Sequence, residues 1–150
     1  MQYHNKPYNK LQVGDTAELV RTCSVDDFYV FANNSGNHNP LHLASEDGDG
    51  DHINEAVAPA MFVGALISAV LGNVLPGAGT QTRRANLAFH VPVLAGDELT
   101  AFVTVAEKLE DGDLICTTEV HRVGDNILVL SGSVQVTPPA QHMEFDSVEV

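Results

Sequence analysis

The sequence predicts an α+β fold in which an antiparallel β-sheet wraps around one long central helix, within a single domain spanning residues 1–150. Three observations support this prediction. Residues 59–75 are apolar on almost every side of a helix. The second half of the chain contains four stretches of about ten residues with strand character, separated by short turns. No internal repeat or linker divides the chain, and its length is sufficient for one hydrophobic core.

The first predicted elements are a strand and a short helix. Residues 16–22 have strand character because apolar side chains stand among polar neighbours. Ser24 and Asp27 have the spacing of a capping box, with Asp where Glu or Gln is commoner, and a short helix should follow. Gly36 can adopt a left-handed conformation and end that helix. We expect residues 37–55 to form a long loop with at most one helical turn.

The centre of that loop superficially resembles a calcium site, because Asp47, Asp49 and Asp51 alternate with glycine. A calcium loop needs a glutamate eleven residues after its first ligand, and Ala58 occupies that position. His52 stands where the glycine of the tight turn belongs. We therefore predict a solvated loop without a bound metal.

The central helix is predicted to run from Pro59 to Leu75, because Pro59 suits a first helical turn and Pro76–Gly77 is a stop signal. Its apolar surface should be buried on most sides, and one sheet cannot cover all of it. We therefore expect a homodimer or a dimer of dimers. Every fourth residue is small, which would let a backbone or a slender ligand lie close: Ala60, Gly64, Ser68 and Gly72. The segment falls short of the roughly 20 residues that a membrane span needs.

The predicted strands of the second half cover residues 81–91, 98–108, 113–123 and 127–137. Turn residues at 95–97, 110–112 and 124–126 connect them, and short connections favour antiparallel pairing. The acidic tail, residues 138–150, begins with two prolines and is expected to be flexible. A sheet of this kind wrapped around one helix is the outline of a hot-dog fold.

Charge and cysteine content narrow the classes of partner and compartment. Seven basic residues against 20 acidic ones give a formal net charge of −13. Such a surface repels phosphate backbones, which argues against nucleic acid as a partner. Cys23 and Cys116 lie far apart without a C-x-x-C motif, so neither a disulfide framework nor a zinc site is expected. Residues 1–11 contain no apolar signal segment. We therefore expect a cytoplasmic protein.

The most specific motif lies between residues 31 and 42, which read Phe-Ala-Asn-Asn-Ser-Gly-Asn-His-Asn-Pro-Leu-His. It resembles the Ser-Gly-Asp-x-Asn-Pro-Leu-His signature of the MaoC-like (R)-specific enoyl-CoA hydratases. The resemblance continues through Leu75-Pro76-Gly77 and Gly96-Asp97 and covers nearly the whole chain. It implies addition of water across a 2-enoyl thioester, or its reversal, on an acyl group carried by CoA or an acyl carrier protein. No cofactor is implied.

The resemblance also implies roles for individual residues. His42 matches the catalytic histidine, and an imidazole can act as a base at neutral pH. Asn39 is expected to fix the loop through Asx-type hydrogen bonds, and Ser68 matches a serine that positions groups in the site. Asn37 replaces the family's catalytic aspartate, and its amide can hold the water in place but has no proton to give. Ala60 replaces a glycine whose N–H serves as an oxyanion donor, and it keeps that N–H.

Two further features leave their alternatives open or are discounted. Arg83 and Arg84 follow the predicted helix, where they would either bind CoA phosphates or solvate the start of a strand. His38 and His42 have an i, i+4 spacing that could suggest a metal site. Pro40 between them breaks the helix that this spacing requires, so no metal is expected.

Three functions are compatible with this family resemblance. The first is a hydratase or dehydratase, impaired by Asn37. The second is a non-catalytic acyl-CoA-binding module that works with a separate phosphate acyltransferase or another enzyme of fatty-acid metabolism. The third is a thioesterase, which typically needs a carboxylate near the start of the helix. No carboxylate lies between Glu55 and Gly96, so this function is disfavoured.

Overall fold

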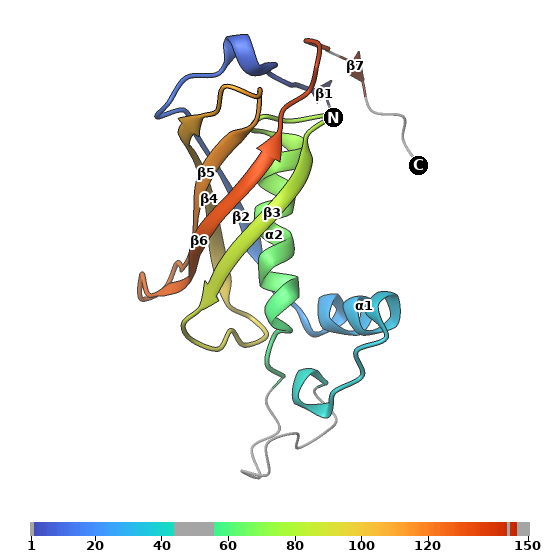
Figure 1. The fold of residues 1–150 in the computed structure, drawn as a ribbon. Helices are drawn as coiled ribbons and strands as arrows, with labels where there is room; N and C mark the ends of the chain where they lie inside the picture. Colours follow the sequence, from blue (N-terminus) through green and yellow to red (C-terminus); the bar gives the residue numbers. More distant parts are fainter. Residues whose placement is uncertain (1, 44–55, 144, 147–150) are drawn as a thin grey trace.

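The computed structural model describes residues 2–43, 56–143 and 145–146, so the calcium-like segment 47–51 lies outside the described residues (Figure 1). The helices and strands are β1 (Gln2–Tyr3), β2 (Thr16–Thr22), α1 (Val25–Ser35), α2 (Ala60–Asn73), β3 (Gln81–Phe89), β4 (Glu98–Lys108), β5 (Leu114–Arg122), β6 (Leu128–Thr137) and β7 (Phe145–Asp146). Two 3-10 helices, η1 (Tyr8–Lys10) and η2 (Pro40–His42), complete the set.

The main sheet has five strands in the order β2-β4-β5-β6-β3, and every neighbouring pair is antiparallel. Figure 1 shows this sheet curving along the length of α2, with α1 beside the amino-terminal end of α2. This arrangement confirms the predicted hot-dog architecture. The strands β2 and β3 form the two edges of the sheet.

The core lies between α2 and the concave face of the sheet. Alternate residues of β4 are fully buried, as the period of a half-buried strand requires: Leu99, Ala101, Val103 and Val105. They belong to the same core cluster as the buried side chains of α2: Phe62, Val63, Leu66, Ile67, Val70 and Leu71. Burial of one such aliphatic or aromatic side chain stabilises the fold by about 1.5–3 kcal/mol.

The central helix is shorter and more exposed than the sequence predicts. Pro59 is its N-cap, and the N–H groups of Val74 and Leu75 both donate to the carbonyl oxygen of Val70, which closes the helix before Pro76. One face of α2 is open in the single chain, where Met61 is 61% exposed. The sheet therefore covers only one face of the helix in one chain, and burial on most sides stays a prediction for the assembled protein.

The short helix α1 agrees with its prediction in detail. The Ser24 hydroxyl accepts from the N–H of Asp27, and the Asp27 carboxylate accepts from the N–H of Ser24. Gly36 has φ +77° and ends the helix in the left-handed region. The Phe28 ring packs edge-to-face on Phe62, with centroids 5.5 Å apart. This contact fixes α1 against the first turn of α2.

Part of the tail that was expected to be flexible contacts the amino-terminal segment. Asn5 is 2% exposed, and its Oδ1 accepts from the N–H of Met143 at 2.7 Å. Its Nδ2 donates to the carbonyl oxygens of Ala78 and Gln141. Strand β7 then pairs with β1. Among the described helices, none combines the length and apolarity that a membrane span requires.

Candidate active site

Three successive side-chain-to-backbone hydrogen bonds shape the loop that leads from α1 to His42. The Ser35 hydroxyl accepts from the N–H of Asn37 at 3.1 Å. The Asn37 Oδ1 then accepts from the N–H of Asn39 at 3.2 Å, and the Asn39 Oδ1 accepts from the N–H of Leu41 at 3.1 Å. The two asparagine bonds are Asx-type, and the serine bond is its hydroxyl counterpart; both kinds join a short side chain to the backbone two residues ahead. They turn the chain into η2 and thereby position His42.

His42 is 9% exposed, and its Nδ1 lies 2.8 Å from the carbonyl oxygen of Val57. A carbonyl oxygen can only accept, so Nδ1 carries a proton in this contact. In the neutral imidazole, Nε2 then holds a free lone pair and can accept a proton. The contact therefore selects the tautomer that a general base at Nε2 requires.

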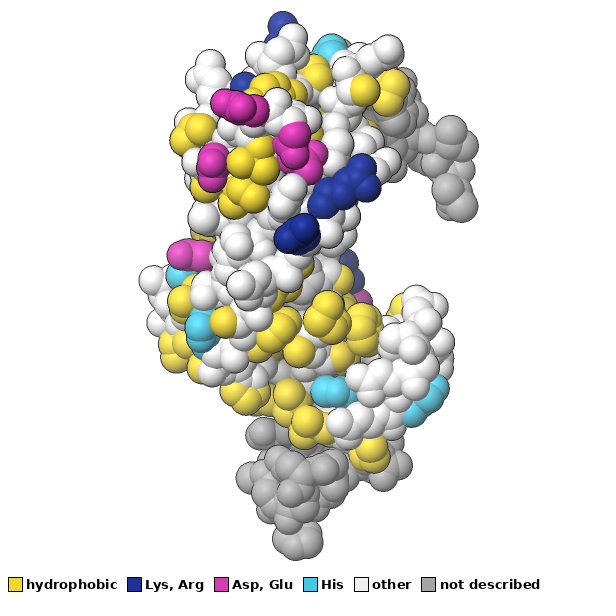
Figure 2. Space-filling model, viewed as in Figure 1, with side chains coloured by type: hydrophobic (Ala, Val, Ile, Leu, Met, Phe, Trp, Pro, Cys, Tyr) yellow, Lys and Arg dark blue, Asp and Glu magenta, His cyan; other side chains and the backbone are white. Residues whose placement is uncertain are grey.

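His42 lines a cavity of about 340 Å³ at the amino-terminal end of α2. The other lining residues are mostly apolar: Leu41, Val57, Ala58, Ala60, Val63, Phe89, His90, Val91, Pro92, Val93 and Val129. Figure 2 shows hydrophobic side chains gathered beside histidine side chains in the region where the sheet approaches the segment of α1 and η2. Such a lining suits an apolar group with a few polar contacts.

The segment that holds His42 is itself held by the loop after β3. The N–H of Ala58 donates to the carbonyl oxygen of Val93 at 2.7 Å, and the N–H of Ala95 donates to that of Ala56 at 3.1 Å. These two bonds bracket Val57, whose carbonyl oxygen contacts His42. Two of the segments that line the cavity, at residues 57–58 and 91–93, are therefore tied together although they lie far apart in the sequence.

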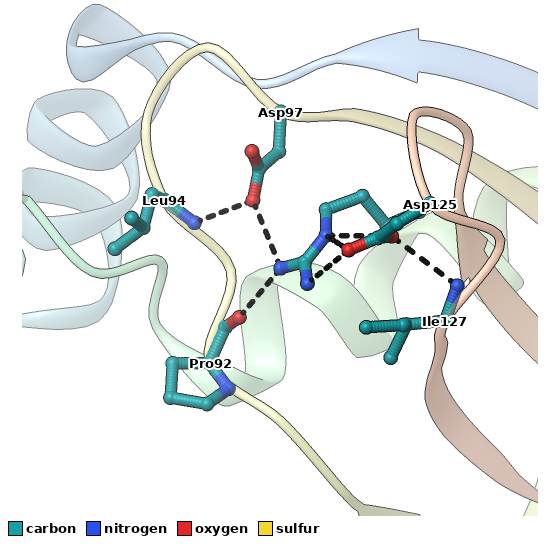
Figure 3. Close-up of polar contacts among 6 residues, drawn as sticks. Pro92, Leu94, Asp97, Asp125 and Ile127 are labelled. Carbon is teal, nitrogen blue, oxygen red and sulfur yellow. Dashed lines mark hydrogen bonds and ion pairs between the residues drawn. The ribbon is translucent and has the colours of Figure 1, made fainter.

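Arg122 bridges that loop to the turn between β5 and β6. Figure 3 shows Pro92, Asp97 and Asp125 gathered around one guanidinium group. Its Nη1 lies 3.4 Å from the carbonyl oxygen of Pro92 and 3.6 Å from Oδ2 of Asp97. The same Oδ2 accepts from the N–H of Leu94 at 2.9 Å. On the other side, Nη2 lies 2.8 Å from Oδ2 of Asp125. Hydrogen bonds from Arg122 lower the pKa of Asp125, so the pair remains charged at neutral pH.

Ala60 also lines the cavity, at the first position of α2. The N–H of a first helical residue has no acceptor within the helix. The aligned peptide dipoles make this end of the helix partly positive. The N–H of Ala60 is therefore suited to an oxygen atom that gains negative charge.

The structure does not bring all of the predicted site residues together. Asn37 and Asn39 are exposed on the loop before His42 and are not among the residues that line its cavity. Ser68 is exposed on α2 and lines a different cavity, of about 330 Å³, between α2 and β3.

The two arginines lie apart from His42 in the single chain. Arg83 is exposed on β3, and its Nε donates to the Thr137 hydroxyl at 2.8 Å. Arg84 is exposed on the same strand and borders a separate depression of about 320 Å³ with Asn86 and Ile115. Both therefore occupy the free edge of the sheet.

Sequence reasoning missed His90, which lies in the cavity with His42. Its Nε2 lies 2.7 Å from the Ser131 hydroxyl, and its N–H donates to the carbonyl oxygen of Val129. His90 falls within the strand predicted over residues 81–91, where no role was expected for it. A histidine shortly before Pro92, where the strand must end, is the signal that was available.

Neither cysteine belongs to this site. Cys23 and Cys116 are buried, and burial raises the pKa of each thiol to about 11. Within the part of the chain that the structure describes, no three His, Cys, Asp or Glu side chains gather as metal ligands do.

Comparisons with known proteins agree with this fold and motif. Residues 10–126 match the model of the MaoC like domain family. An (R)-specific enoyl-CoA hydratase from Rhodospirillum rubrum is 31% identical over 134 residues, which cover 89% of this chain and 92% of that protein. A 3-hydroxybutyryl-CoA dehydratase from Methylorubrum extorquens is 35% identical over 135 residues, covering 88% and 83% respectively.

Solved structures extend the comparison. The unliganded R-hydratase PhaJ1 from Pseudomonas aeruginosa superposes with a TM-score of 0.92 at 33% identity, over 100% of this chain and 96% of that one. A hot-dog-like protein from Thermanaerovibrio acidaminovorans gives a TM-score of 0.58 at 16% identity, over 85% and 82% of the two chains, and so shares the fold alone.

Proposed function

The chain belongs to the MaoC-like domain family, and from that premise we propose that it is a hydro-lyase acting on 2-enoyl-CoA or, in reverse, on 3-hydroxyacyl-CoA. The observation that carries the proposal is the contact between His42 Nδ1 and the Val57 carbonyl oxygen, which leaves Nε2 free as a base inside an apolar cavity. Relatives named (R)-specific enoyl-CoA hydratase and 3-hydroxybutyryl-CoA dehydratase support the same chemistry.

In this proposal the apolar cavity takes the enoyl group of the thioester. His42 Nε2 accepts a proton from water as the water oxygen attacks C3. The N–H of Ala60 donates to the thioester oxygen, where negative charge develops as electrons leave the double bond. A donor aimed at such an oxygen contributes about 2.7–4 kcal/mol to transition-state stabilisation. A proton delivered to C2 completes the addition, and dehydration follows the same steps in reverse.

Asn37 distinguishes this chain from the pattern of its family. The side chain is an amide, and its Oδ1 already accepts from the N–H of Asn39. In our proposal Asn37 orients the loop that leads to His42 and transfers no proton. General acid–base participation contributes about 10²–10⁴-fold to rate, so a chain relying on His42 alone would be slow by that order.

A second candidate function follows from the same residue. A chain without the catalytic carboxylate would serve as a non-catalytic acyl-CoA-binding module beside a phosphate acyltransferase or another fatty-acid enzyme. In that case the cavity at His42 binds the acyl group and catalyses no hydration. A thioesterase is less favoured, because no carboxylate is among the residues that line the cavity in the described part of the chain.

We also propose that two chains associate through α2 and β3. The open face of α2 carries Met61, and the free edge of the sheet carries Phe89, which is 43% exposed. Pairing of two β3 edges would satisfy backbone groups that are otherwise left to water. It would also place Ser68, Arg83 and Arg84 near the partner chain, where the arginines would suit the phosphates of CoA.

The experiment that tests the function compares the wild-type protein with Asn37→Asp, using (E)-but-2-enoyl-CoA as substrate. Loss of the enoyl absorbance and release of free thiol are followed together. Enoyl loss by the wild type supports the hydratase. Turnover by Asn37→Asp alone supports the binding module, free thiol supports the thioesterase, and inactivity of both chains contradicts enoyl-CoA hydration.

A further inference from the structure

We propose that His90 is the second proton-transfer group of this cavity, supplying the proton that Asn37 cannot give. The inference rests on the proposed hydro-lyase function and extends it to a residue outside the family signature. Hydration needs a base for water and an acid for C2. Of the described residues that line the cavity, only His42 and His90 have side chains that can serve as a general acid or base.

The position of His90 is fixed by its backbone and its ring. It follows the last residue of β3, and its N–H donates to the carbonyl oxygen of Val129 at 2.8 Å. The ring Nε2 lies 2.7 Å from the Ser131 hydroxyl. Val129 also lines the cavity, so this bond ties His90 to a neighbouring residue of the wall.

Ser131 is a suitable partner for a histidine that changes its protonation state. A hydroxyl group both donates and accepts, and it can rotate between the two roles. The contact with Nε2 therefore survives whether that nitrogen carries a proton or not. The other nitrogen, Nδ1, has no hydrogen-bond partner among the described residues and is free to give or take a proton.

The full step balances with these two histidines. His42 Nε2 takes a proton from water, the water oxygen bonds to C3, and the π electrons move toward the thioester. His90, entering as the imidazolium, gives its proton to C2 as the new C–H bond forms. The product is the 3-hydroxyacyl thioester, with His42 protonated and His90 neutral. Exchange with solvent returns both histidines to their starting states.

The variant His90→Gln tests this role, because glutamine keeps a polar group beside Ser131 but cannot transfer a proton. With (E)-but-2-enoyl-CoA we expect kcat to fall by about a hundredfold, with KM changed by less than about threefold. His121→Gln is the matched control: its Nε2 lies 2.8 Å from Glu119, and it does not line this cavity. The control should keep the wild-type kcat, and the melting temperatures should agree.

The variant His90→Ala assayed with added imidazole separates a proton-transfer role from a structural one. Free imidazole should recover part of the kcat that His90→Ala loses, whereas damage to the cavity would persist. His90→Gln with wild-type kcat overturns the proposal, as does a slow His90→Ala that imidazole fails to restore. A wild-type chain that binds substrate without turnover overturns the proposed function itself, and the role of His90 with it.

Discussion

The imidazole Nδ1 of His42 lies 2.8 Å from the carbonyl oxygen of Val57, fifteen residues further along the chain. The N–H of Val57 in turn donates to the carbonyl oxygen of Leu41, so the two segments hold each other. Val57 also forms a β-bridge with Leu94. The ring therefore depends for its orientation on the loop after β3 as well as on its own motif.

Replacement of His42 by glutamine should remove the base and leave the cavity in place. We expect kcat for enoyl hydration to fall by about 10²–10⁴-fold, with a small change in KM. His38→Gln is the control, because His38 is exposed on the same loop and does not line the cavity. Steady-state kinetics with both variants checks the prediction. Equal losses in the two variants would mean that the loop, rather than the imidazole, is affected.

Replacement of Arg122 by glutamine should slow the reaction, although Arg122 does not line the cavity and is not expected to contact the substrate. The guanidinium links Pro92 and Asp97 to Asp125, and the loop it holds is bonded to the residues on either side of Val57. A small displacement of a catalytic group costs up to about a hundredfold in rate. We expect a loss in kcat of about tenfold or more, since His42 would lose its fixed orientation.

The control for this variant is Arg21→Gln. Arg21 pairs with Asp27 at 2.7 Å on an exposed surface, where an ion pair contributes about 0–1 kcal/mol. It should leave kcat unchanged. If Arg122→Gln lowers the melting temperature but leaves kcat intact, Arg122 stabilises the fold only.

Patterns within one segment of the sequence were sufficient to predict most elements. The capping box at Ser24, the glycine at residue 36 and the alternation along β4 all act through near neighbours, and each element formed as expected. The pairing of Asn5 with Met143 has no such local signal, because its partners are brought together only by the finished fold.

The site was predicted less completely for the same reason. Ala60 and Ser68 share a helix face in the sequence, yet eight residues of helix separate them by about 12 Å, and they line different cavities. His90 enters the site through the pairing of β3 with β6, which no spacing in the sequence displays. The motif around His42 could be recognised because its hydrogen bonds are nearly all local.

Removal of the Phe28 ring should destabilise the fold strongly. Phe28 is fully buried and packs edge-to-face on Phe62. Truncation of a buried Phe to Ala typically costs about 3–5 kcal/mol, so Phe28→Ala should lower the free energy of unfolding by that amount. Urea denaturation at fixed protein concentration measures it. Val30→Ala, at a residue 59% exposed on the same helix, should change it by less than about 0.5 kcal/mol.

Both cysteines should be unreactive in the folded protein. Burial raises the pKa of Cys23 and Cys116 to about 11, whereas an unfolded thiol titrates near 8.5. The folded state therefore holds these protons more firmly, and this contribution to stability is complete below about pH 8.5 and is lost as the pH rises toward 11. A disulfide reagent at pH 8 should modify neither thiol until denaturant is added. Rapid modification of the native protein would contradict the burial.

A charge at the open face of α2 should separate the two chains of the proposed dimer. Met61 is 61% exposed in one chain and lies beside the free edge strand β3, so association would bury it. A carboxylate buried without a partner costs several kcal/mol, and each 1.4 kcal/mol is tenfold in affinity. Met61→Glu should therefore weaken dimerisation by about a hundredfold or more, as measured by sedimentation equilibrium. Val20→Glu is the control, since Val20 is 54% exposed on the opposite edge strand β2. If Val20→Glu dissociates the dimer and Met61→Glu does not, the chains meet through β2 instead.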